Sequence, residues 1–156
     1  MFGFFKKSQT IDICAPIAGE VVDITAVPDD TFAQKMLGDG IAIKTQDNTL
    51  FAPCDGTIAV ISETKHALVL KNGKIEILIH VGLDTVDLNG EGFNVYVSLN
   101  DNVKQGDRLL TFDRELLLSK GKTLITPLVV LNMDQVKSME KNFGLVNDKV
   151  LIIGTK

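Results

Sequence analysis

The sequence predicts an all-β protein, an antiparallel β-sandwich or barrel with a duplicated motif and one or two short helices. Helical periodicity is scarce, and glycine-marked turns separate many short runs rich in valine, isoleucine and leucine. In addition, one segment of the chain occurs twice in similar form. Together these three observations favour short paired strands over packed helices.

Most of the expected elements are strands, because the apolar runs are short and are bounded by turn residues. The expected strands are 12–14, 20–25, 40–44, 49–52, 57–61, 66–71, 75–81, 95–97, 108–112 and 126–132, and a final pair at 137–140 and 149–153. One short helix is expected at 30–37, with Asp29 or Asp30 as N-cap and Gly38 as terminator. A second short helix is expected at 113–119.

The repeated segment is APIAGEVVDI at 15–24, which matches APCDGTIAVI at 52–61. In both copies Ala-Pro precedes a glycine, which suits a tight turn that leads into a strand. The V-x-x-G-D-x-L pattern within 100–113 adds a hairpin typical of barrel-sandwich hybrids. The repeat therefore predicts a duplicated β motif and carries no chemistry.

Length and composition set further limits. A chain of 156 residues fits one domain, expected at 12–156 after a flexible tail at 1–11. The formal net charge of −4 argues against nucleic acid as a partner. There is no secretory signal and no apolar run long enough to span a membrane, so we expect a free-standing cytoplasmic protein. Cys14 and Cys54 are expected to be reduced thiols.

Two histidines lie close together in the sequence and are candidates for chemistry. A two-residue turn at 72–73 would place Lys65 opposite His80, whereas a three-residue loop at 72–74 places His66 opposite His80. The second register is preferred because it places Val69 and Ala67 on the same side as the isoleucines of 75–81, which makes one coherent core face. The two Cβ atoms would then stand about 5 Å apart, so that both imidazoles could touch one small group.

Leu68 and Leu78 would lie beside the two imidazoles as exposed neighbours, and such an apolar surface is typical of a docking patch. The alternative is that both histidines merely decorate a sheet face. Neutral imidazole can act as a nucleophile, bind a metal or shuttle protons. Two histidines provide too few ligands for zinc, and the H-x-x-x-D of 80–84 lacks the H-x-H of a peptidase. Acyl-transfer and nucleotide motifs are absent, so any phosphoryl group would have to arrive already activated.

Three segments carry a family resemblance: VPDDTFAQKMLGDGIAIK at 27–44, TKHA at 64–67 and ILIHVGLDTVDLNGEGF at 77–93. Together they resemble the glucose-type enzyme IIA family, the phosphocarrier of the bacterial sugar phosphotransferase system. The likeness runs in order over about residues 12–113, and 114–156 are less distinctive. It implies an antiparallel β-sandwich with a duplicated motif and no nucleotide or organic cofactor.

The resemblance also implies roles for single residues. His80 matches the histidine that is phosphorylated on Nε2, with its Nδ1–H bonded to a nearby carbonyl such as that of Gly82. His66 matches the second histidine, which contacts the phosphoryl group, and Thr64 matches a hydroxyl that orients His66. The implied donor is the histidine phosphocarrier protein, and the implied acceptor is the IIB domain of a membrane sugar permease.

A docking surface is expected around this pair. Phe32, Met36 and Leu37 lie in the segment that matches the family's docking surface, and Phe32 and Met36 could share one helix face. A core-facing helix stripe is the alternative. Asp29 and Asp84 could meet a basic partner rim, although Asp29 could equally be a plain helix cap.

Two further possibilities remain open from the sequence. The chain could be a regulatory binding module that holds permeases or metabolic kinases, with phosphorylation of His80 as the switch. In some relatives a zinc ion bridges the two histidines and a carboxylate of the partner, so His66 and His80 could contribute to an interfacial zinc site. A lipoyl or biotinyl carrier is disfavoured, because Lys74 lacks the expected setting.

Overall fold

The computed structural model describes residues 9–145 and 148–156. Its strands are β1 Thr10–Cys14, β2 Gly19–Asp23, β3 Asp39–Thr45, β4 Thr49–Phe51, β5 Gly56–Ile61, β6 Ala67–Asn72, β7 Ile75–His80, β8 Phe93–Val95, β9 Asn102–Val103, β10 Arg108–Phe112, β11 Ile125–Val130, β12 Val136–Lys141 and β13 Lys149–Thr155. The α-helices are α1 Asp30–Ala33 and α2 Arg114–Ser119, and the 3-10 helices are η1 Ile24–Ala26, η2 Thr85–Leu88 and η3 Met133–Gln135.

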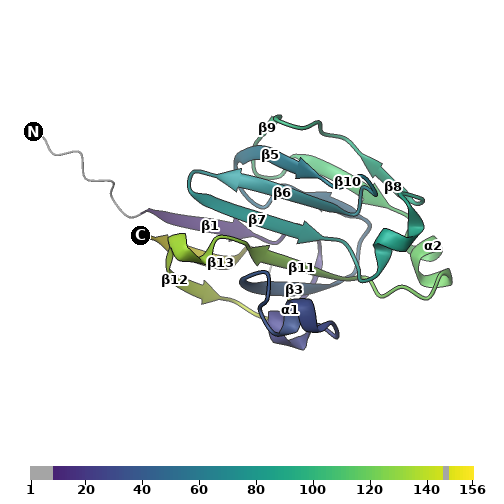
Figure 1. Cartoon of the computed structure of the whole chain (residues 1–156), viewed down its shortest axis with the longest axis horizontal. Coiled ribbons are helices and arrows are strands. Elements are labelled where there is room, and N and C mark those ends of the chain that lie inside the picture. The colour runs from purple at the N-terminus through teal and green to yellow at the C-terminus, as the bar shows by residue number, and fades with distance from the viewer. Residues whose placement is uncertain (1–8, 146–147) are drawn as a thin grey trace, which may run out of the picture.

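The strands form three sheets that enclose one main core (Figure 1). The largest sheet has the order β2-β3-β11-β7-β6-β5-β9, and the two smaller sheets have the orders β1-β13-β12 and β4-β10-β8. Every pairing between these strands is antiparallel. The predicted all-β antiparallel fold with short helices is therefore confirmed.

Each copy of the duplicated segment forms one strand of an antiparallel pair within the large sheet. β2 pairs with β3 and β5 pairs with β6, and both β2 and β5 begin at the glycine of the repeat. A Cβ atom added at Gly19 would collide with the carbonyl oxygen of Lys44, and one added at Gly56 would collide with that of Lys71. The repeated glycine is therefore needed because a neighbouring strand approaches closely in both copies.

One predicted helix is shorter than expected. α1 begins at Asp30 with Asp29 as N-cap, as predicted, but it ends at Ala33, so the predicted end at residue 37 is wrong. Lys35 adopts a left-handed conformation with φ of 58°, and the Met36 N–H donates to the carbonyl of Thr31 at 3.2 Å. The helix therefore ends five residues before Gly38. The helix predicted at 113–119 agrees with α2, which Asp113 caps by accepting from the Leu116 N–H.

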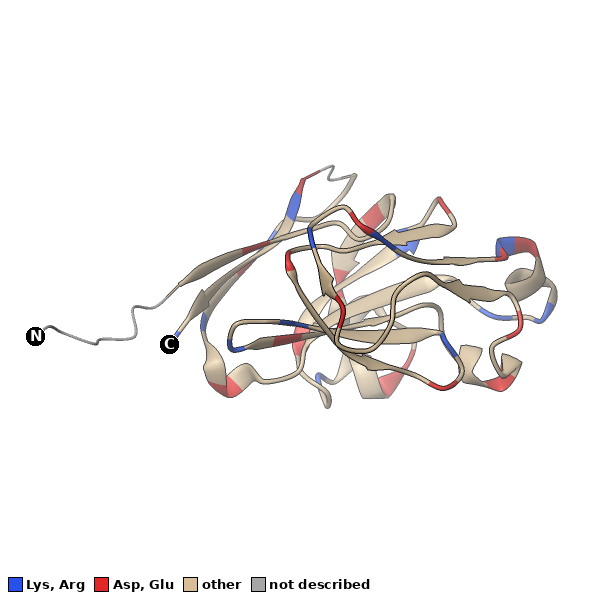
Figure 2. Cartoon of the chain, turned by 90° about the horizontal axis from the view of Figure 1, so that it is seen from above, with Lys and Arg blue, Asp and Glu red and all other residues tan. Residues whose placement is uncertain are grey.

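The N-terminal boundary also differs from expectation. The tail predicted at 1–11 lies outside the described residues for positions 1–8, but Thr10 and Ile11 belong to β1, and Ile11 is buried in the core. Within the described part of the chain, no helix is long and apolar enough to cross a membrane. Charged residues of both signs lie mainly at strand ends and in loops (Figure 2).

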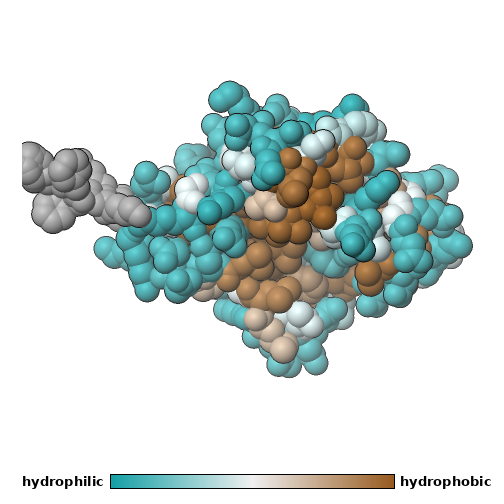
Figure 3. All heavy atoms as spheres, turned by 45° about the horizontal axis from the view of Figure 1, so that its top comes forward, coloured by the Kyte–Doolittle hydropathy of each residue, from teal (hydrophilic) through white to brown (hydrophobic). Residues whose placement is uncertain are grey.

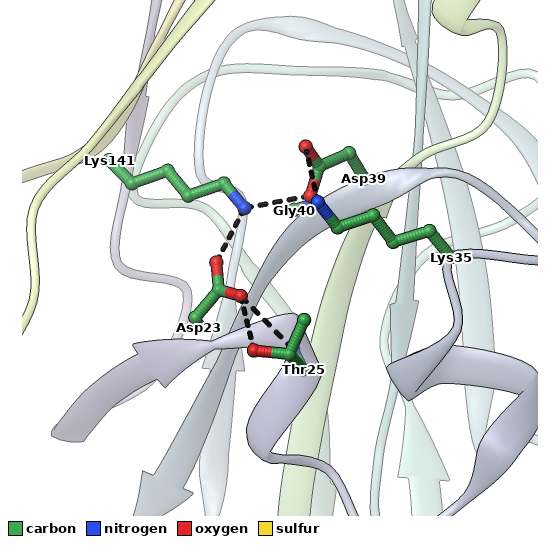
Figure 4. Close-up of polar contacts among 6 residues, drawn as sticks. All are labelled: Asp23, Thr25, Lys35, Asp39, Gly40 and Lys141. Atoms are coloured by element: carbon green, nitrogen blue, oxygen red, sulfur yellow. Dashed lines mark hydrogen bonds and ion pairs between the residues drawn. The ribbon is translucent and has the colours of Figure 1, made fainter.

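A half-buried ion cluster ties the C-terminal hairpin to the large sheet (Figure 4). Lys141 of β12 places its Nζ 2.5 Å from Asp23 Oδ1 on β2 and 2.7 Å from Asp39 Oδ1 on β3. Asp23 also accepts from the hydroxyl of Thr25 at 2.6 Å. Burial alone would raise the pKa of Asp23, but the hydrogen bonds from Lys141 and Thr25 outweigh it and lower that pKa to about 2.

Candidate functional site

The hairpin that carries the histidines has a different register from the predicted one. β6 and β7 pair Ala67 with His80 and Asn72 with Ile75, so the turn is the two-residue Gly73–Lys74. The prediction that His66 lies directly opposite His80 is wrong by one residue. The turn lies here because Gly73 supplies the left-handed φ of 55°.

This register exchanges the two faces of β6. Leu68 is 1% exposed and belongs to the main core together with Leu70, opposite Ile79 and Ile77. The prediction that Leu68 lies on the docking surface is therefore wrong, because its side chain points into the core. The slip has this effect because successive residues of a strand point to opposite faces.

The two imidazoles nevertheless lie together, by a route other than direct pairing. His66 precedes β6, and Lys65 before it turns the chain with a left-handed φ of 64°. The carbonyl of His66 then accepts from the Val81 N–H at 2.8 Å, which fixes this end of the loop against β7. The ring centroids of His66 and His80 are 4.6 Å apart, with the planes at 81°.

His80 is half-buried and is held from two sides. Its Nδ1 lies 2.7 Å from the carbonyl oxygen of Gly82, and the ring of Phe32 packs against it at 5.2 Å between centroids. Gly82 has φ of 72°, and a Cβ atom there would lie 2.7 Å from the carbonyl oxygen of Thr123. Glycine is therefore required at the residue whose carbonyl meets the imidazole. Phe32 is buried and serves as a wall of the site, not as an exposed docking residue.

His66 is buried, with 6% of its surface exposed. Its Nδ1 lies 2.7 Å from the hydroxyl oxygen of Thr64 and 3.4 Å from that of Ser62. The sequence pointed to Thr64 but gave no role to Ser62. The spacing of two hydroxyl residues, two and four positions before the histidine, is the signal that could have indicated both.

Both imidazoles are electrically neutral at neutral pH. Burial, and then the nearby His80, lower the pKa of His66 to about 4. Burial also lowers the pKa of His80, although the hydrogen bond to Gly82 and the charges of Asp29 and Asp84 act in the opposite direction. A neutral imidazole keeps a lone pair on one ring nitrogen, which makes it a nucleophile or an acceptor.

The remaining residues of the expected docking surface are spread over two environments. Met36 is 69% exposed and Leu37 is 39% exposed, but both lie beyond the end of α1, so Met36 does not share a helix face with Phe32. Leu78 is half-buried against the smaller apolar cluster, which α1 and η1 help to form. Val86, which the sequence analysis did not include, is 50% exposed in the segment after β7. Apolar surface is continuous on one face of the molecule (Figure 3).

The two aspartates also differ in setting. Asp29 is half-buried and caps α1, because its Oδ1 accepts from the Thr31 N–H at 2.9 Å. Asp84 is exposed and has a left-handed φ of 57°. Both carboxylates lie near enough to His80 for their charges to raise its pKa, so they are candidates for the electrostatic rim of the site.

Metal binding by this chain alone lacks ligands. Within residues 9–145 and 148–156, no group of three or more His, Cys, Asp or Glu side chains could hold a metal ion. The His66–His80 pair by itself provides two ligands, whereas zinc takes three or four from protein. An interfacial zinc site completed by a partner stays a prediction.

The fold and the site together define a class of protein, an antiparallel β-sandwich that holds two adjoining imidazoles beside exposed apolar side chains. Residues 11–136 match the model of the family described as "phosphoenolpyruvate-dependent sugar phosphotransferase system, EIIA 1". The chain belongs to this family, as the sequence resemblance predicted.

Relatives and a solved structure agree with this membership. A "PTS system glucose-specific EIIA component" of Borreliella burgdorferi is 46% identical over 97% of this chain and 82% of its own length. A protein of the same description from Haemophilus influenzae is 43% identical over 90% of this chain and 86% of its own length. The glucose permease IIA of Mycoplasma capricolum superposes with a TM-score of 0.86 at 32% identity, covering 99% of this chain and all of that one.

Proposed function

We propose that this chain is a phosphohistidine carrier in glucose-type sugar uptake. It would accept a phosphoryl group from the histidine phosphocarrier protein and pass it to the IIB domain of a sugar permease, with residues 10–156 acting as one domain. Membership of the family and the names of the relatives support this assignment. The reaction is a transfer between proteins, and this chain is both the acceptor and the donor.

The observation that carries the proposal is the 2.7 Å contact between His80 Nδ1 and the carbonyl oxygen of Gly82. A carbonyl oxygen only accepts, so Nδ1 must carry the proton and Nε2 must hold the lone pair. In the transfer, the P–N bond to the donor's histidine breaks while a P–N bond to His80 Nε2 forms. The proton stays on Nδ1, and the Gly82 carbonyl stabilises the positive charge that the ring then gains.

His66 is proposed to support the phosphoryl group. Its ring lies against His80, and its Nδ1 is occupied by the hydroxyl of Thr64, which leaves the proton on Nε2 free to donate to a phosphoryl oxygen. A donor placed in advance contributes most when negative charge is redistributed in the transition state. Because His66 is buried and uncharged, it does so without repelling His80.

The surroundings suit brief contact with more than one protein. Met36, Leu37 and Val86 are exposed apolar residues, and Asp84 adds an exposed carboxylate. Adaptable apolar side chains accept differently shaped partners and exclude water, which would otherwise hydrolyse the P–N bond. The carboxylates would steer a partner that has a basic rim.

The test is intact-mass measurement after incubation with the phosphorylated histidine phosphocarrier protein. We expect one acid-labile, base-stable phosphoryl group on the parent chain and none on the His80→Ala variant. Phosphorylation of His80→Ala with loss in another variant would overturn the site.

A second variant tests the role of His66. His66→Gln is expected to accept the phosphoryl group but to pass it to the IIB domain at least tenfold more slowly, roughly the loss of one preorganised donor. The rate is measured by rapid-quench transfer from isolated phosphorylated chain. Equal onward rates in His66→Gln and the parent would refute the role.

A further inference from the structure

Two hydroxyl groups converge on one ring nitrogen of His66. Thr64 Oγ1 lies 2.7 Å from Nδ1 and Ser62 Oγ lies 3.4 Å from the same atom. Both side chains are half-buried and come from the loop between β5 and β6. The proposed function uses only Thr64, so the second hydroxyl needs an account of its own.

Ser62 is tied to both strand ends of this loop. Its N–H donates to the carbonyl of Ala67 at 3.0 Å, and its carbonyl accepts from the Lys65 N–H at 2.9 Å. Its hydroxyl oxygen accepts from the Ala67 N–H at 3.1 Å. The oxygen is therefore held in place by the backbone, and the hydroxyl hydrogen remains to be directed elsewhere.

A count of the side-chain hydrogens favours one arrangement of the three groups. If His66 carried its proton on Nδ1, one hydrogen would be shared between two oxygens, and the hydroxyl hydrogens of Ser62 and Thr64 would both lack this acceptor. If Nδ1 is unprotonated, both hydroxyl hydrogens can point to its lone pair. A half-buried donor without a partner is costly, so the second arrangement is preferred.

We propose that Ser62 is a positioning residue for His66: together with Thr64 it donates to Nδ1 and so holds the proton of His66 on Nε2. The inference rests on the proposed function, because a proton on Nε2 is what lets His66 donate to the phosphoryl group. At 3.4 Å the Ser62 hydrogen bond is weaker than that of Thr64, so its removal has the smaller effect.

The direct test reads the ring nitrogens without any phosphoryl donor. Protein with ¹⁵N-labelled histidine is recorded as parent, Ser62→Ala, Ser62→Thr and Thr64→Val, with Ser98→Ala as an exposed control. We expect Nε2–H for His66 in the parent, a shift towards Nδ1–H in Ser62→Ala, a larger shift in Thr64→Val, and parent-like signals in Ser62→Thr and Ser98→Ala.

Onward transfer to the IIB domain is then measured for the same variants. Ser62→Ala is expected to slow it about three- to fivefold and Thr64→Val about tenfold, as suits one weak and one good hydrogen bond. Ser62→Thr should stay within about twofold of the parent, since it keeps the hydroxyl. Phosphoryl uptake by His80 should be unchanged in the exposed control Ser98→Ala.

Two results would overturn the inference. One is a parent in which His66 already carries its proton on Nδ1. The other is a Ser62→Ala chain in which the amide signal of Ala67 moves but the His66 nitrogens do not, because Ser62 would then only close the loop. If the parent takes up no phosphoryl group at all, the proposed function fails, whereas the nitrogen signals still report whether Ser62 sets the tautomer.

Discussion

Two half-buried sites in this molecule hold nitrogen bases and treat them in opposite ways. At the Lys141 cluster, two carboxylates lie within 2.7 Å of the ammonium group, and the pKa of Lys141 is raised although burial alone would lower it. At the histidine pair, the contacts of the ring nitrogens are hydroxyl and carbonyl oxygens, and both pKa values are lowered.

The pKa values shift in opposite directions mainly because different groups contact the nitrogen atoms, and less because of burial. Carboxylates compensate for the hydration free energy that an ion loses on leaving water, whereas neutral oxygens compensate too little to keep an imidazolium charged. The first arrangement fixes β12 onto β2 and β3. The second arrangement keeps both rings neutral at pH 7, and the free lone pair on His80 Nε2 is the one that the proposed phosphoryl acceptor requires.

Removal of the positive charge at the Lys141 cluster should have the largest effect on stability. Lys141→Met keeps most of the apolar stem but leaves Asp23 and Asp39 without the ammonium group that compensates them. We expect the free energy of unfolding to fall by about 3 kcal/mol, the low end of the range for buried ion pairs, because two half-buried carboxylates lose the ammonium group that they share. Denaturant unfolding measures the change.

The matched control is Lys44→Met on β3. Lys44 lies 3.9 Å from Glu20 and both side chains are largely exposed. Such a pair contributes little, so the control should change the stability by no more than about 0.5 kcal/mol. Equal effects of the two substitutions would mean that the cluster does not depend on its charge.

The stability of the chain, measured over a range of pH, tests the neutral state of the histidine pair. The folded-state pKa of His66 is about 4, below the ordinary histidine value of 6.5, so the unfolded chain binds this proton more readily. Stability is therefore lost as the pH falls from 6.5 towards 4. Between pH 7 and pH 5 this amounts to about 2 kcal/mol for His66 alone.

His66→Gln removes that proton-binding group and is the variant to compare. Its stability should fall less than that of the parent between pH 7 and pH 5, with the difference close to the value above. Asp23 hardly affects this window, because its contribution to stability is lost between its ordinary pKa of 3.8 and its lowered pKa of about 2, both of which lie below pH 5. Parallel pH profiles for parent and variant would contradict the neutral, desolvated state of His66.

Much of the fold could be predicted because strand signals are local. The runs at 57–61, 108–112 and 137–140 lie within one or two residues of β5, β10 and β12, and the repeated glycines begin equivalent strands. The predictions were wrong at positions where a lysine adopts a left-handed backbone conformation. Lys35 ends α1 early and Lys65 turns the chain before β6, and no sequence pattern marks a lysine with positive φ.

The candidate site could likewise be predicted only in part. The proximity of His66 and His80 was anticipated, but from a register that places Leu68 on the wrong face. From the sequence, either a three-residue or a two-residue loop could close this hairpin. Only the packing of Leu68 and Leu70 into the core decides which register forms. Ser62 was missed because a serine near a strand end is common and acquires meaning only from its distance to Nδ1.

The smallest expected effect concerns the carboxylates that do lie near the histidines. Asp29 and Asp84 raise the pKa of His80, although not enough to offset burial. Asp29→Asn keeps the N-cap of α1, because asparagine caps as well as aspartate, and Asp84→Asn changes an exposed side chain. Each substitution should lower the pKa of His80 a little further, as read from the pH dependence of its ring signals.

Asp134→Asn on η3 serves as the control, since Asp134 is not among the groups that shift His80. His80 is already neutral at pH 7, so losing one carboxylate should leave its own reactivity almost unchanged. Encounter with a basic partner should slow instead, and more at low ionic strength than at high. A rise in the His80 pKa, or a loss of rate that is independent of salt, would show that these aspartates act by contact and not through their charge. In that case packing alone would hold the histidine pair, and the two carboxylates would belong to the docking surface.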